Sequence, residues 1–419
     1  MNSPPNSIPR QSDFSPTSDS PKPRNNGSHP PKSPDKDNVR PVSRHLMVPP
    51  SPSSSNISPL AVSSTHEAEL IRSIEDGDRA TDDLDETRSL TESIRQHIMD
   101  GNLRYHSYRQ GRYLFPNDEA EQDREELKHN LTVYLCDGKL FFAPIEDLLE
   151  KGAEVLDLGT GIGKWCIDLA DNYPKSQFHG MDLSPIQPDW VPENAIFFVD
   201  DIEHEAGWTY PEGTFDYIHV RHVVHSLKDR ELVWDRIWKY DTQQLPSLTR
   251  LISSRHLKPG GYVEVQEFQH IAACDDNSCD GPYAWRDFTS YLRDGMAALG
   301  SDIDGIIHVE RELYEAGFEN IATKNYKCPV GPWAKKPRLQ ECGHVMRDIV
   351  MWGLVGLARR PFRDGLGWTL IQIEMFLVEV RKALMEEVNG LPKYHTYFPY
   401  TNIYARKPLE PPTQAEASA

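Results

Sequence analysis

A glycine-rich loop is the first part of the sequence whose residue types and spacing could do chemistry. It reads Asp157-Leu158-Gly159-Thr160-Gly161-Ile162-Gly163. Glycines let the backbone turn sharply and approach a ligand closely, and a helix that follows such a loop offers free N–H groups to that ligand. A dinucleotide site favours the spacing G-x-G-x-x-G, but Lys164 stands where its third glycine would be. The loop therefore predicts a site for a planar or anionic group and makes a dinucleotide a poor fit.

Acidic residues end the next two apolar runs of the sequence. Asp182 ends the first run, and Asp200 and Asp201 end the second. A carboxylate in the first position can accept hydrogen bonds from ribose hydroxyls. In the second position either Asp200 or Asp201 could accept from an exocyclic amine, while Ile202 packs on a purine face. Loop and acids together indicate a nucleoside-containing ligand.

Two further groups of side chains could take part in the chemistry. Arg221, His222 and His225 follow the fourth apolar run, where a neutral histidine could take a proton from a hydroxyl or the group could clamp a carboxylate. These three side chains could equally cap or pack against the next helix. Tyr105 and Tyr113 bound a tyrosine-rich segment that either lines a pocket for a cationic group or forms a packed lid without contact.

The elements that must position these residues form an alternating pattern. Strand-like runs occur at 154–158, 178–182, 196–200, 215–220 and 261–266, with helical stretches between them. This pattern predicts a doubly wound α/β core with a parallel sheet, in which ligands bind beyond the carboxyl ends of the strands. We also expect helices from about Asp118 to Gly138, over 141–149, 164–172 and 309–317, and strands over 318–330 and near 401–405.

The segment before the last strand predicts a helical cap. Apolar residues recur there at helical steps, with a glycine that favours a helix end: Leu370, Ile373, Leu377, Val380, Leu384, Val388 and Gly390. We interpret them as a stripe that faces the core, with a partner-binding face as the alternative.

Composition divides the chain into segments. Of the first 64 residues 30 are Ser or Pro, which predicts a disordered tail over 1–64. The tail's basic residues could serve nuclear import or phosphorylation, although a solvated tail is the simpler interpretation. We expect an acidic linker and helical cap over 65–150, the core over 151–330, a helical insertion over 331–395, the final strand over 396–409 and a disordered end over 410–419.

Charge and cysteine usage exclude several classes of protein. The 419 residues carry a net charge of −19, which disfavours direct nucleic-acid binding because phosphates require a clustered basic face. The only close cysteine pair, Cys274 and Cys279, lacks partners at metal-site spacing, so we expect free thiols and no bound metal. No stretch approaches 18 uninterrupted apolar residues, which predicts a soluble, intracellular protein without membrane insertion.

The ordered motifs resemble class I S-adenosylmethionine-dependent methyltransferases. The resemblance rests on the glycine loop, the two acidic positions and the turn Leu257-Lys258-Pro259-Gly260-Gly261 before the fifth strand. It implies the cofactor S-adenosyl-L-methionine, with its methionine part at Asp157, Gly159, Gly161 and Gly163, its ribose at Asp182, and its adenine amine at Asp201 or Asp200. Methyltransferases of base or amide nitrogen often carry an Asn/Asp-Pro-Pro-aromatic motif after the fourth strand. Here His219-Val220-Arg221-His222 stands there, so such acceptors are disfavoured.

A narrower resemblance extends over about 100–409. The segments 105–113, 116–119, 121–124, 185–188 and 403–408 are similar to the fungal LaeA-like methyltransferases. This implies a methyltransferase connected with the regulation of secondary metabolism or development, velvet-family proteins as partners, and a location in nucleus and cytoplasm. The segment Asp241 to Arg255 and Thr160, where the regulator has cysteine, depart from the pattern and favour a paralogue. The alternatives are a protein-binding regulatory subunit and a small-molecule O-methyltransferase; the methyl acceptor stays open.

Overall fold

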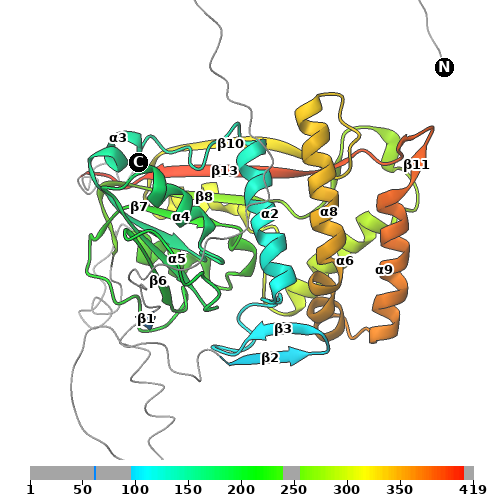
Figure 1. Ribbon diagram of the computed structural model, residues 1–419, viewed down its shortest axis with the longest axis horizontal. Coiled ribbons are helices and arrows are strands. Elements are labelled where there is room, and N and C mark those ends of the chain that lie inside the picture. Colours follow the sequence, from blue (N-terminus) through cyan, green and yellow to red (C-terminus); the bar gives the residue numbers. More distant parts are fainter. Residues whose placement is uncertain (1–60, 63–95, 239–254, 410–419) are drawn as a thin grey trace, which may run out of the picture. The chain divides into compact units, whose positions relative to one another are not determined.

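The computed structural model describes residues 61–62, 96–238 and 255–409 (Figure 1). The rest of the predicted tail 1–64, most of the segment 241–255 and the end 410–419 lie outside the described residues. All of the described residues belong to one compact unit of the chain, which begins at Asn56.

A central sheet organises the described chain in the order β1-β6-β5-β4-β7-β8-β13-β10. Its parallel strands are β4 (Glu154–Leu158), β5 (Gln177–Asp182), β6 (Ala195–Val199), β7 (Phe215–Arg221) and β8 (Leu257–Phe268). The last strand, β13 (Thr396–Arg406), pairs antiparallel with β8 and with β10 (Glu319–Pro329), and with the short β9 (Ala273–Cys274). The strand order reverses at β4, which confirms the doubly wound α/β fold.

Helices cover both faces of this sheet. On one face α3 (Glu146–Lys151) and α4 (Lys164–Asn172) pack through Leu149, Trp165 and Leu169 against Phe178. On the other face α5 (Arg230–Trp238) and α7 (Ile306–Glu315) pack against the opposite side chains of β7 and β8. Because the central strands are covered from both sides, even some of their polar side chains, such as His219 and Glu264, are fully buried. These buried groups are hydrogen-bonded: His219 to Asp157, and Glu264 to the backbone N–H groups of Phe142 and Ala143.

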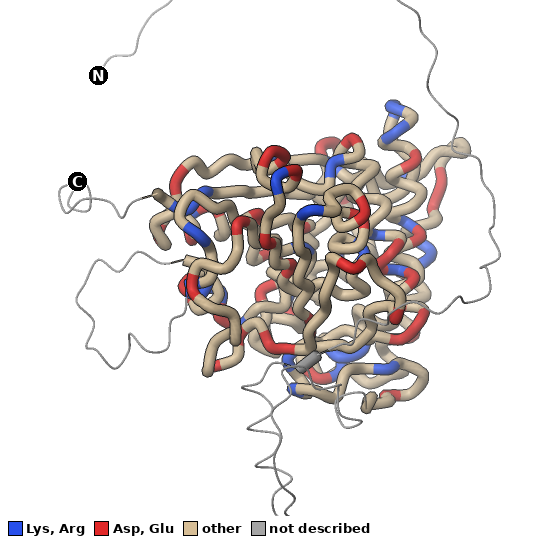
Figure 2. The backbone as a smooth tube through the Cα atoms, turned by 60° about the vertical axis from the view of Figure 1, so that its left-hand side comes forward, with Lys and Arg blue, Asp and Glu red and all other residues tan. Residues whose placement is uncertain are grey.

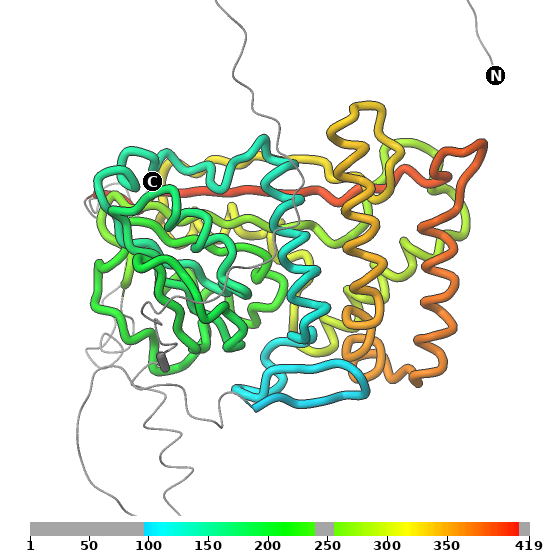
Figure 3. The backbone as a smooth tube through the Cα atoms, in the orientation of Figure 1, coloured from blue at the N-terminus to red at the C-terminus, as the bar shows by residue number. Residues whose placement is uncertain are grey.

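A second set of helices lies beyond the ends of β8 and β13 (Figures 1 and 3). It consists of α2 (Glu119–Leu135), α6 (Ala284–Ala298), α8 (Pro337–Arg360) and α9 (Leu370–Met385). A helical turn over Pro361–Gly365 extends α8, and short turns occupy Val224–Ser226 and Asn277–Cys279. The hairpin β2 (His97–Asp100) and β3 (Leu103–His106) leads into α2. These helices share a separate apolar core, so they form a cap on the sheet.

Most expected elements match, and the differences have physical reasons. The helices expected at 164–172 and from about Asp118 to Gly138 are confirmed. The helix expected over 141–149 begins only at Glu146, because the backbone N–H groups of Phe142 and Ala143 donate to the buried carboxylate of Glu264. The final strand, expected near 401–405 within the segment 396–409, runs over Thr396–Arg406.

Two sequence predictions are wrong in detail. Ala61–Val62, inside the tail predicted to be disordered, forms the short strand β1 and pairs in parallel with Phe198 and Val199. The helix α9 ends at Met385, and β11 (Glu387–Val388) and β12 (Leu391–Pro392) form a hairpin instead. Asn389 and Gly390 both have positive φ, which suits a two-residue hairpin turn rather than a helix end.

Surface charge and thiols agree with the composition. In Figure 2 basic and acidic segments are interspersed along the described backbone rather than collected on a single basic face. All six cysteines carry free thiols. Within the described ranges no helix is both long and apolar enough to cross a membrane.

Candidate active site

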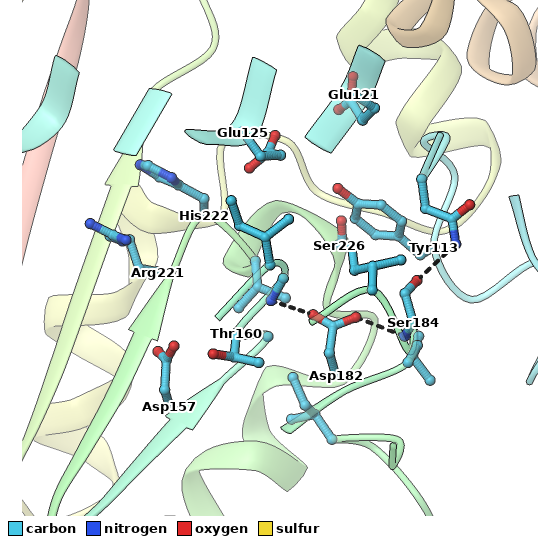
Figure 4. A pocket seen from close by; sticks show the side chains of 18 of the residues that line it. Tyr113, Glu121, Glu125, Asp157, Thr160, Asp182, Ser184, Arg221, His222 and Ser226 are labelled. Atoms are coloured by element: carbon cyan, nitrogen blue, oxygen red, sulfur yellow. Dashed lines mark hydrogen bonds between the residues drawn. The ribbon is translucent and has the colours of Figure 1, made fainter. Parts of the chain in front are cut away.

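A large cavity opens at the carboxyl ends of β4, β5, β6 and β7. Its floor comes from the loops after these strands, and its roof comes from α2 and the segment before α2. Figure 4 shows Glu121 and Glu125 of α2 on one side of this first cavity and Asp157, Thr160 and Asp182 on the other. Its volume is about 1200 Å³, counted with the open mouth.

The glycine loop has the shape that only glycines permit. Gly159, Gly161 and Gly163 all have positive φ, between 57° and 75°. A Cβ on Gly163 would lie 2.5 Å from the ring of Phe197, whereas a Cβ on Gly161 would meet nothing within 4 Å. Gly163 therefore permits close packing against the sheet, while Gly161 borders open space in the cavity. The helix α4 begins directly after the loop, so its free N–H groups face the same region.

Asp182 at the end of β5 is tied to this loop. Its Oδ2 accepts a hydrogen bond from the backbone N–H of Gly161 and its Oδ1 accepts one from Ser184, both at 2.8 Å. The side chain of Gln187 donates to the carbonyl of Gly161 and braces the loop from the other side. Burial raises the pKa of Asp182 to about 6. Each carboxylate oxygen has a second lone pair, so Asp182 can still accept hydrogen bonds from a ligand.

Asp157 lines the same cavity and is held by a histidine of the neighbouring strand β7. It is buried, and its Oδ1 lies 2.7 Å from Nδ1 of His219. The ring of His219 stacks on Trp165 with 3.8 Å between the ring centres. Asp157 is thereby fixed in one position at the start of the loop.

The structure separates the two acidic candidates after β6. Asp201 and Ile202 line the cavity, whereas Asp200 does not and instead accepts a hydrogen bond from the backbone N–H of Asp201. The guanidinium of Arg112 approaches from the segment before α2, with Nε 3.2 Å from Oδ2 of Asp201 and Nη1 3.7 Å from Glu203. Arg112 thus connects the roof of the cavity to its floor.

Asp118 caps α2, as expected for a helix that begins near this residue, and Asn117 beside it donates to the hydroxyl of Ser184 at 3.3 Å. The roof also contains residues to which the sequence had assigned no role in the site. Glu121, Glu125 and His129 all line the cavity from α2. They recur at steps of four, so a polar stripe within an otherwise apolar helical pattern is the signal that could have found them.

The two predicted tyrosines have different positions. Tyr113 lines the cavity, but Tyr105 does not. The buried ring of Tyr105 lies under the guanidinium of Arg360, 3.6 Å from ring centre to Cζ. The geometry therefore assigns Tyr105 to the packing of the cap, and the expectation that it contacts the ligand is corrected.

The cluster after β7 is divided between two cavities. Arg221 and His222 line the first cavity. Arg221 donates to Nδ1 of His129 at 2.7 Å, and Nε2 of His129 in turn lies 2.9 Å from Asp168. His222 has a left-handed backbone with φ of 57°, and burial lowers its pKa well below the ordinary value, so its ring is neutral. His225 instead lines a second cavity.

The second cavity adjoins the first and is mostly apolar. Tyr113 and Glu125 line both cavities, so they form part of the wall between them. Its other walls come from α6, α8, the end of β8 and β13. Nδ1 of His225 lies 3.1 Å from the carboxylate of Glu267, at the end of β8. Arg124, Glu125 and Lys128 of α2, with His270 and Thr289, are the other polar side chains of a lining that is mostly aromatic and aliphatic.

Two buried polar atoms in the first cavity test whether a nucleoside cofactor fits there. Oγ of Ser226 and Nε2 of His222 make no hydrogen bond to the described residues, and both side chains line the cavity. Buried polar atoms without partners are rare, so a ligand with matching donors and acceptors is expected. The open space at Gly161 and the two free lone pairs of Asp182 fit S-adenosylmethionine, as the sequence motifs imply.

Comparisons with known proteins agree with this geometry. The family described as a methyltransferase domain matches residues 127–322. Methyltransferase pytC of Aspergillus terreus is 33% identical over 325 residues, which cover 76% of this chain and 91% of that protein. The secondary metabolism regulator laeA of Aspergillus niger is 33% identical over 314 residues, or 73% of this chain and 75% of that protein.

Two more matches carry substrate names. The protein-methionine methyltransferase laeA of Emericella nidulans is 31% identical over 311 residues, or 73% of this chain and 75% of that protein. A solved phosphoethanolamine N-methyltransferase 2 of Haemonchus contortus, with S-adenosylhomocysteine bound, is a remote likeness. It is 17% identical, with 75% of this chain and 71% of that chain covered and a TM-score of 0.36. On the strength of the pytC and laeA relatives, the chain belongs to the family of S-adenosylmethionine-dependent methyltransferases that includes these two proteins.

Proposed function

We propose that this methyltransferase acts by catalysis in secondary metabolism, on an acceptor held in the second cavity. The observation that carries the proposal is the contact between the two cavities at Tyr113 and Glu125. A protein that used its methyltransferase domain only as a scaffold would have no use for an enclosed acceptor site beside an intact cofactor site.

The residues of the first cavity have separate tasks in this proposal. Asp182 accepts hydrogen bonds from the ribose, and Asp201 accepts from the adenine amine beside Ile202. The bound cofactor supplies an electrophilic methyl group on a sulfonium. The ring of Tyr113 stands where the two cavities meet, and the face of an aromatic ring favours a cationic group. Arg112 and α2 exclude water by covering the site.

Calorimetry with S-adenosylmethionine tests the cofactor part of this proposal. We expect wild type to bind and Asp182→Ala to lose binding while its melting temperature stays within a few degrees of wild type. A thermal shift with a nicotinamide cofactor, together with no heat from S-adenosylmethionine, would contradict the proposal.

A regulatory role is the second candidate, favoured by the relatives named as regulators of secondary metabolism. In it the protein binds velvet-type partners in nucleus and cytoplasm, and methyl transfer is secondary. Complementation of a deletion strain with the Asp182→Ala form distinguishes the two. Full restoration of the wild-type metabolites would show that catalysis is not the function.

The same strains can address the acceptor and the location. Feeding isotope-labelled methionine and profiling methylated metabolites and proteins would show which labelled products vanish on deletion. A fluorescent fusion that is excluded from nuclei under all growth conditions would contradict the nuclear part of the regulatory role.

A further inference from the structure

We propose that the second cavity binds a flat aromatic acceptor with an ionisable hydroxyl, and that His225, oriented by Glu267, takes the proton from that hydroxyl. This inference rests on the proposed function, because it names the class of acceptor for the same site.

The walls of the second cavity suit a flat ring rather than a polar chain. Six aromatic side chains line it: Phe268 at the end of β8, Trp285 and Phe288 of α6, Phe398 of β13, and Tyr113 and Phe115 of the segment before α2. Trp285 and Phe288 stack with 5.4 Å between ring centres, and Phe398 meets Trp285 edge to face at 5.7 Å. Aromatic walls favour an aromatic guest, because offset and edge-to-face pairs add to the gain from burial.

One buried donor among these walls lacks a partner. The indole N–H of Trp285 makes no hydrogen bond to the described residues, although the side chain is only 2% exposed. A buried donor without a partner is costly, so a ligand oxygen in its reach would relieve that cost. The acceptor should therefore carry an oxygen in addition to its reacting hydroxyl, such as a ring carbonyl.

His225 and Glu267 are arranged so that the imidazole of His225 can accept a proton. Burial acts to raise the pKa of Glu267, but the interactions of this side chain with His225 outweigh burial and hold the pKa below its usual value, so the side chain is a carboxylate. A carboxylate only accepts, so Nδ1 of His225 donates to it and Nε2 carries the lone pair. The other oxygen of Glu267 accepts from the backbone N–H of Phe268, which fixes the carboxylate.

Other charged and titratable groups surround His225. Glu125 and Lys128 of α2 pair with each other at 2.6 Å, so their charges nearly offset. Burial lowers the pKa of His270 to about 4, and its Nδ1 lies 3.2 Å from the carbonyl of Ile303. His222 lies on the first cavity and is neutral as well. Of the histidines here, His225 is the one that pairs directly with a buried carboxylate.

The step balances without a further reactant. The acceptor hydroxyl gives its proton to Nε2 of His225, and an oxygen lone pair forms the new bond to the methyl carbon. The carbon–sulfur bond breaks and leaves its electron pair on sulfur, which becomes a neutral thioether. The imidazolium then releases the proton to water. A methionine acceptor has no proton to lose, so this pair would serve no purpose in thioether methylation.

A divalent metal is the competing occupant of this cluster. One ligand atom each from His225, Glu267 and His270 lies within 4.8 Å of the others. However, both oxygens of Glu267 already accept hydrogen bonds. The positive charge of Lys128 also acts to lower the pKa of both Glu267 and His270, so a cation is already present near the cluster. A second cation there is unfavourable, so the geometry favours proton transfer over metal binding.

A chromogenic phenol tests the inference without the cofactor. 4-Nitrophenol changes its absorbance on ionisation, so a pH titration in the presence of the protein reports the ionisation of the bound probe. We expect the apparent pKa of the bound probe to fall by at least one unit relative to free probe, which is a tenfold gain in the ratio of ionised to neutral probe. The His225→Gln and Glu267→Gln variants should lose this shift.

A second histidine–carboxylate pair provides the matched control. Nε2 of His179 on β5 lies 2.9 Å from the carboxylate of Glu154, the first residue of β4. Neither residue lines either cavity. His179→Gln should leave the shift of the probe unchanged. An unchanged shift in His225→Gln would overturn the inference, as would a shift abolished by EDTA, which would assign the cluster to a metal.

Failure of the inference and failure of the proposed function are distinguishable. Wild type that binds S-adenosylmethionine but does not ionise the probe retains the proposed function and lacks this acceptor chemistry. If wild type binds no S-adenosylmethionine, the proposed function is wrong, whether or not the protein shifts the ionisation of 4-nitrophenol. Methyl transfer to a methionine peptide at equal rate in wild type and His225→Gln, with none to phenols, would also overturn the inference.

Discussion

The two cavities of this methyltransferase are built in different ways. The floor of the first consists of loops that each directly follow a strand of the sheet, and its functional groups are carboxylates and free backbone N–H groups. The second is assembled from α2, α6, α8 and the ends of β8 and β13, and its surface is mainly aromatic. Changes to one cavity should therefore leave ligand binding in the other largely intact. Variants that disturb one cavity and spare the other test this independence.

The largest effect is expected from Gly163→Ala. The new Cβ would lie 2.5 Å from the ring of Phe197 in a backbone conformation of positive φ, so the loop must move. We expect the affinity for S-adenosylmethionine to fall at least about a hundredfold, since the loop holds the cofactor. The binding of 4-nitrophenol in the second cavity should change less than about twofold.

Gly138→Ala is the matched control for this change. Gly138 also has positive φ, but its Cβ would meet nothing within 4 Å. It should lose only the roughly 1 kcal/mol of stability that such a backbone costs an alanine, with no loss of cofactor affinity by calorimetry. Equal losses of affinity in both variants would show that strain, rather than the packing of the loop, explains the effect.

Filling the second cavity should have the next largest effect. Ile349 of α8 lines that cavity and is buried. Ile349→Phe should weaken 4-nitrophenol binding about tenfold or more, because the larger ring occupies the space of the ligand, while cofactor affinity stays unchanged. Ile371→Phe, the same change at a side chain that is 73% exposed, should alter neither affinity. A matching loss of cofactor affinity in Ile349→Phe would mean that the two cavities are coupled.

The first cavity could be predicted from the sequence because its residues are local. The glycine loop, Asp182 and Asp201 each follow a strand within a few residues, and the parallel sheet brings the strand ends together. The doubly wound fold class and the start of α2 could be predicted for the same reason, whereas the order of the strands was not predicted. The choice between Asp200 and Asp201 could not, because it depends on which side chain faces inward after β6.

The second cavity could not be predicted, because its walls meet only through tertiary packing. Phe268, Trp285, Ile349 and Phe398 lie in four different elements spread over 131 positions of the chain. Nothing local distinguishes them from other core residues. The pairing of His225 with Glu267 joins residues 42 positions apart, so the sequence alone left His225 between a catalytic and a packing role.

Cofactor affinity should depend on pH through Asp182. Burial raises the pKa of this carboxyl to about 6, and the ribose hydroxyls need the ionised form as acceptor. As the pH falls below 6 the proton competes with the cofactor, so the dissociation constant should rise by up to about tenfold per pH unit. Calorimetry between pH 5 and 8 checks this, and Asp182→Asn should flatten the dependence. A flat profile in wild type would show that Asp182 does not contact the ligand.

A smaller effect is expected from the connection between roof and floor. Arg112 is partly exposed, and its ion pairs with Asp201 and Glu203 are therefore weakened by solvent. Arg112→Gln should speed cofactor dissociation by roughly three- to tenfold in stopped-flow measurements, with 4-nitrophenol binding unaffected. Arg311→Gln, which removes an exposed ion pair with Glu315, is the control and should change nothing. A slower dissociation would contradict the role of Arg112 as a cover.

The smallest effect is expected from removing residues 1–64. Within this segment the described contact with the fold is β1, which pairs through Ala61 and Val62 at the edge of the sheet. The loss of two such pairs should cost on the order of 1 kcal/mol, a fall in melting temperature of no more than about 2–4 °C, with cofactor affinity unchanged. Removal of residues 1–116 is the comparison, because it also takes Arg112 and Tyr113 from the first cavity and should weaken cofactor binding strongly. Equal losses of binding in the two truncations, measured by thermal melt and calorimetry, would show that residues 1–64 are part of the working cofactor site.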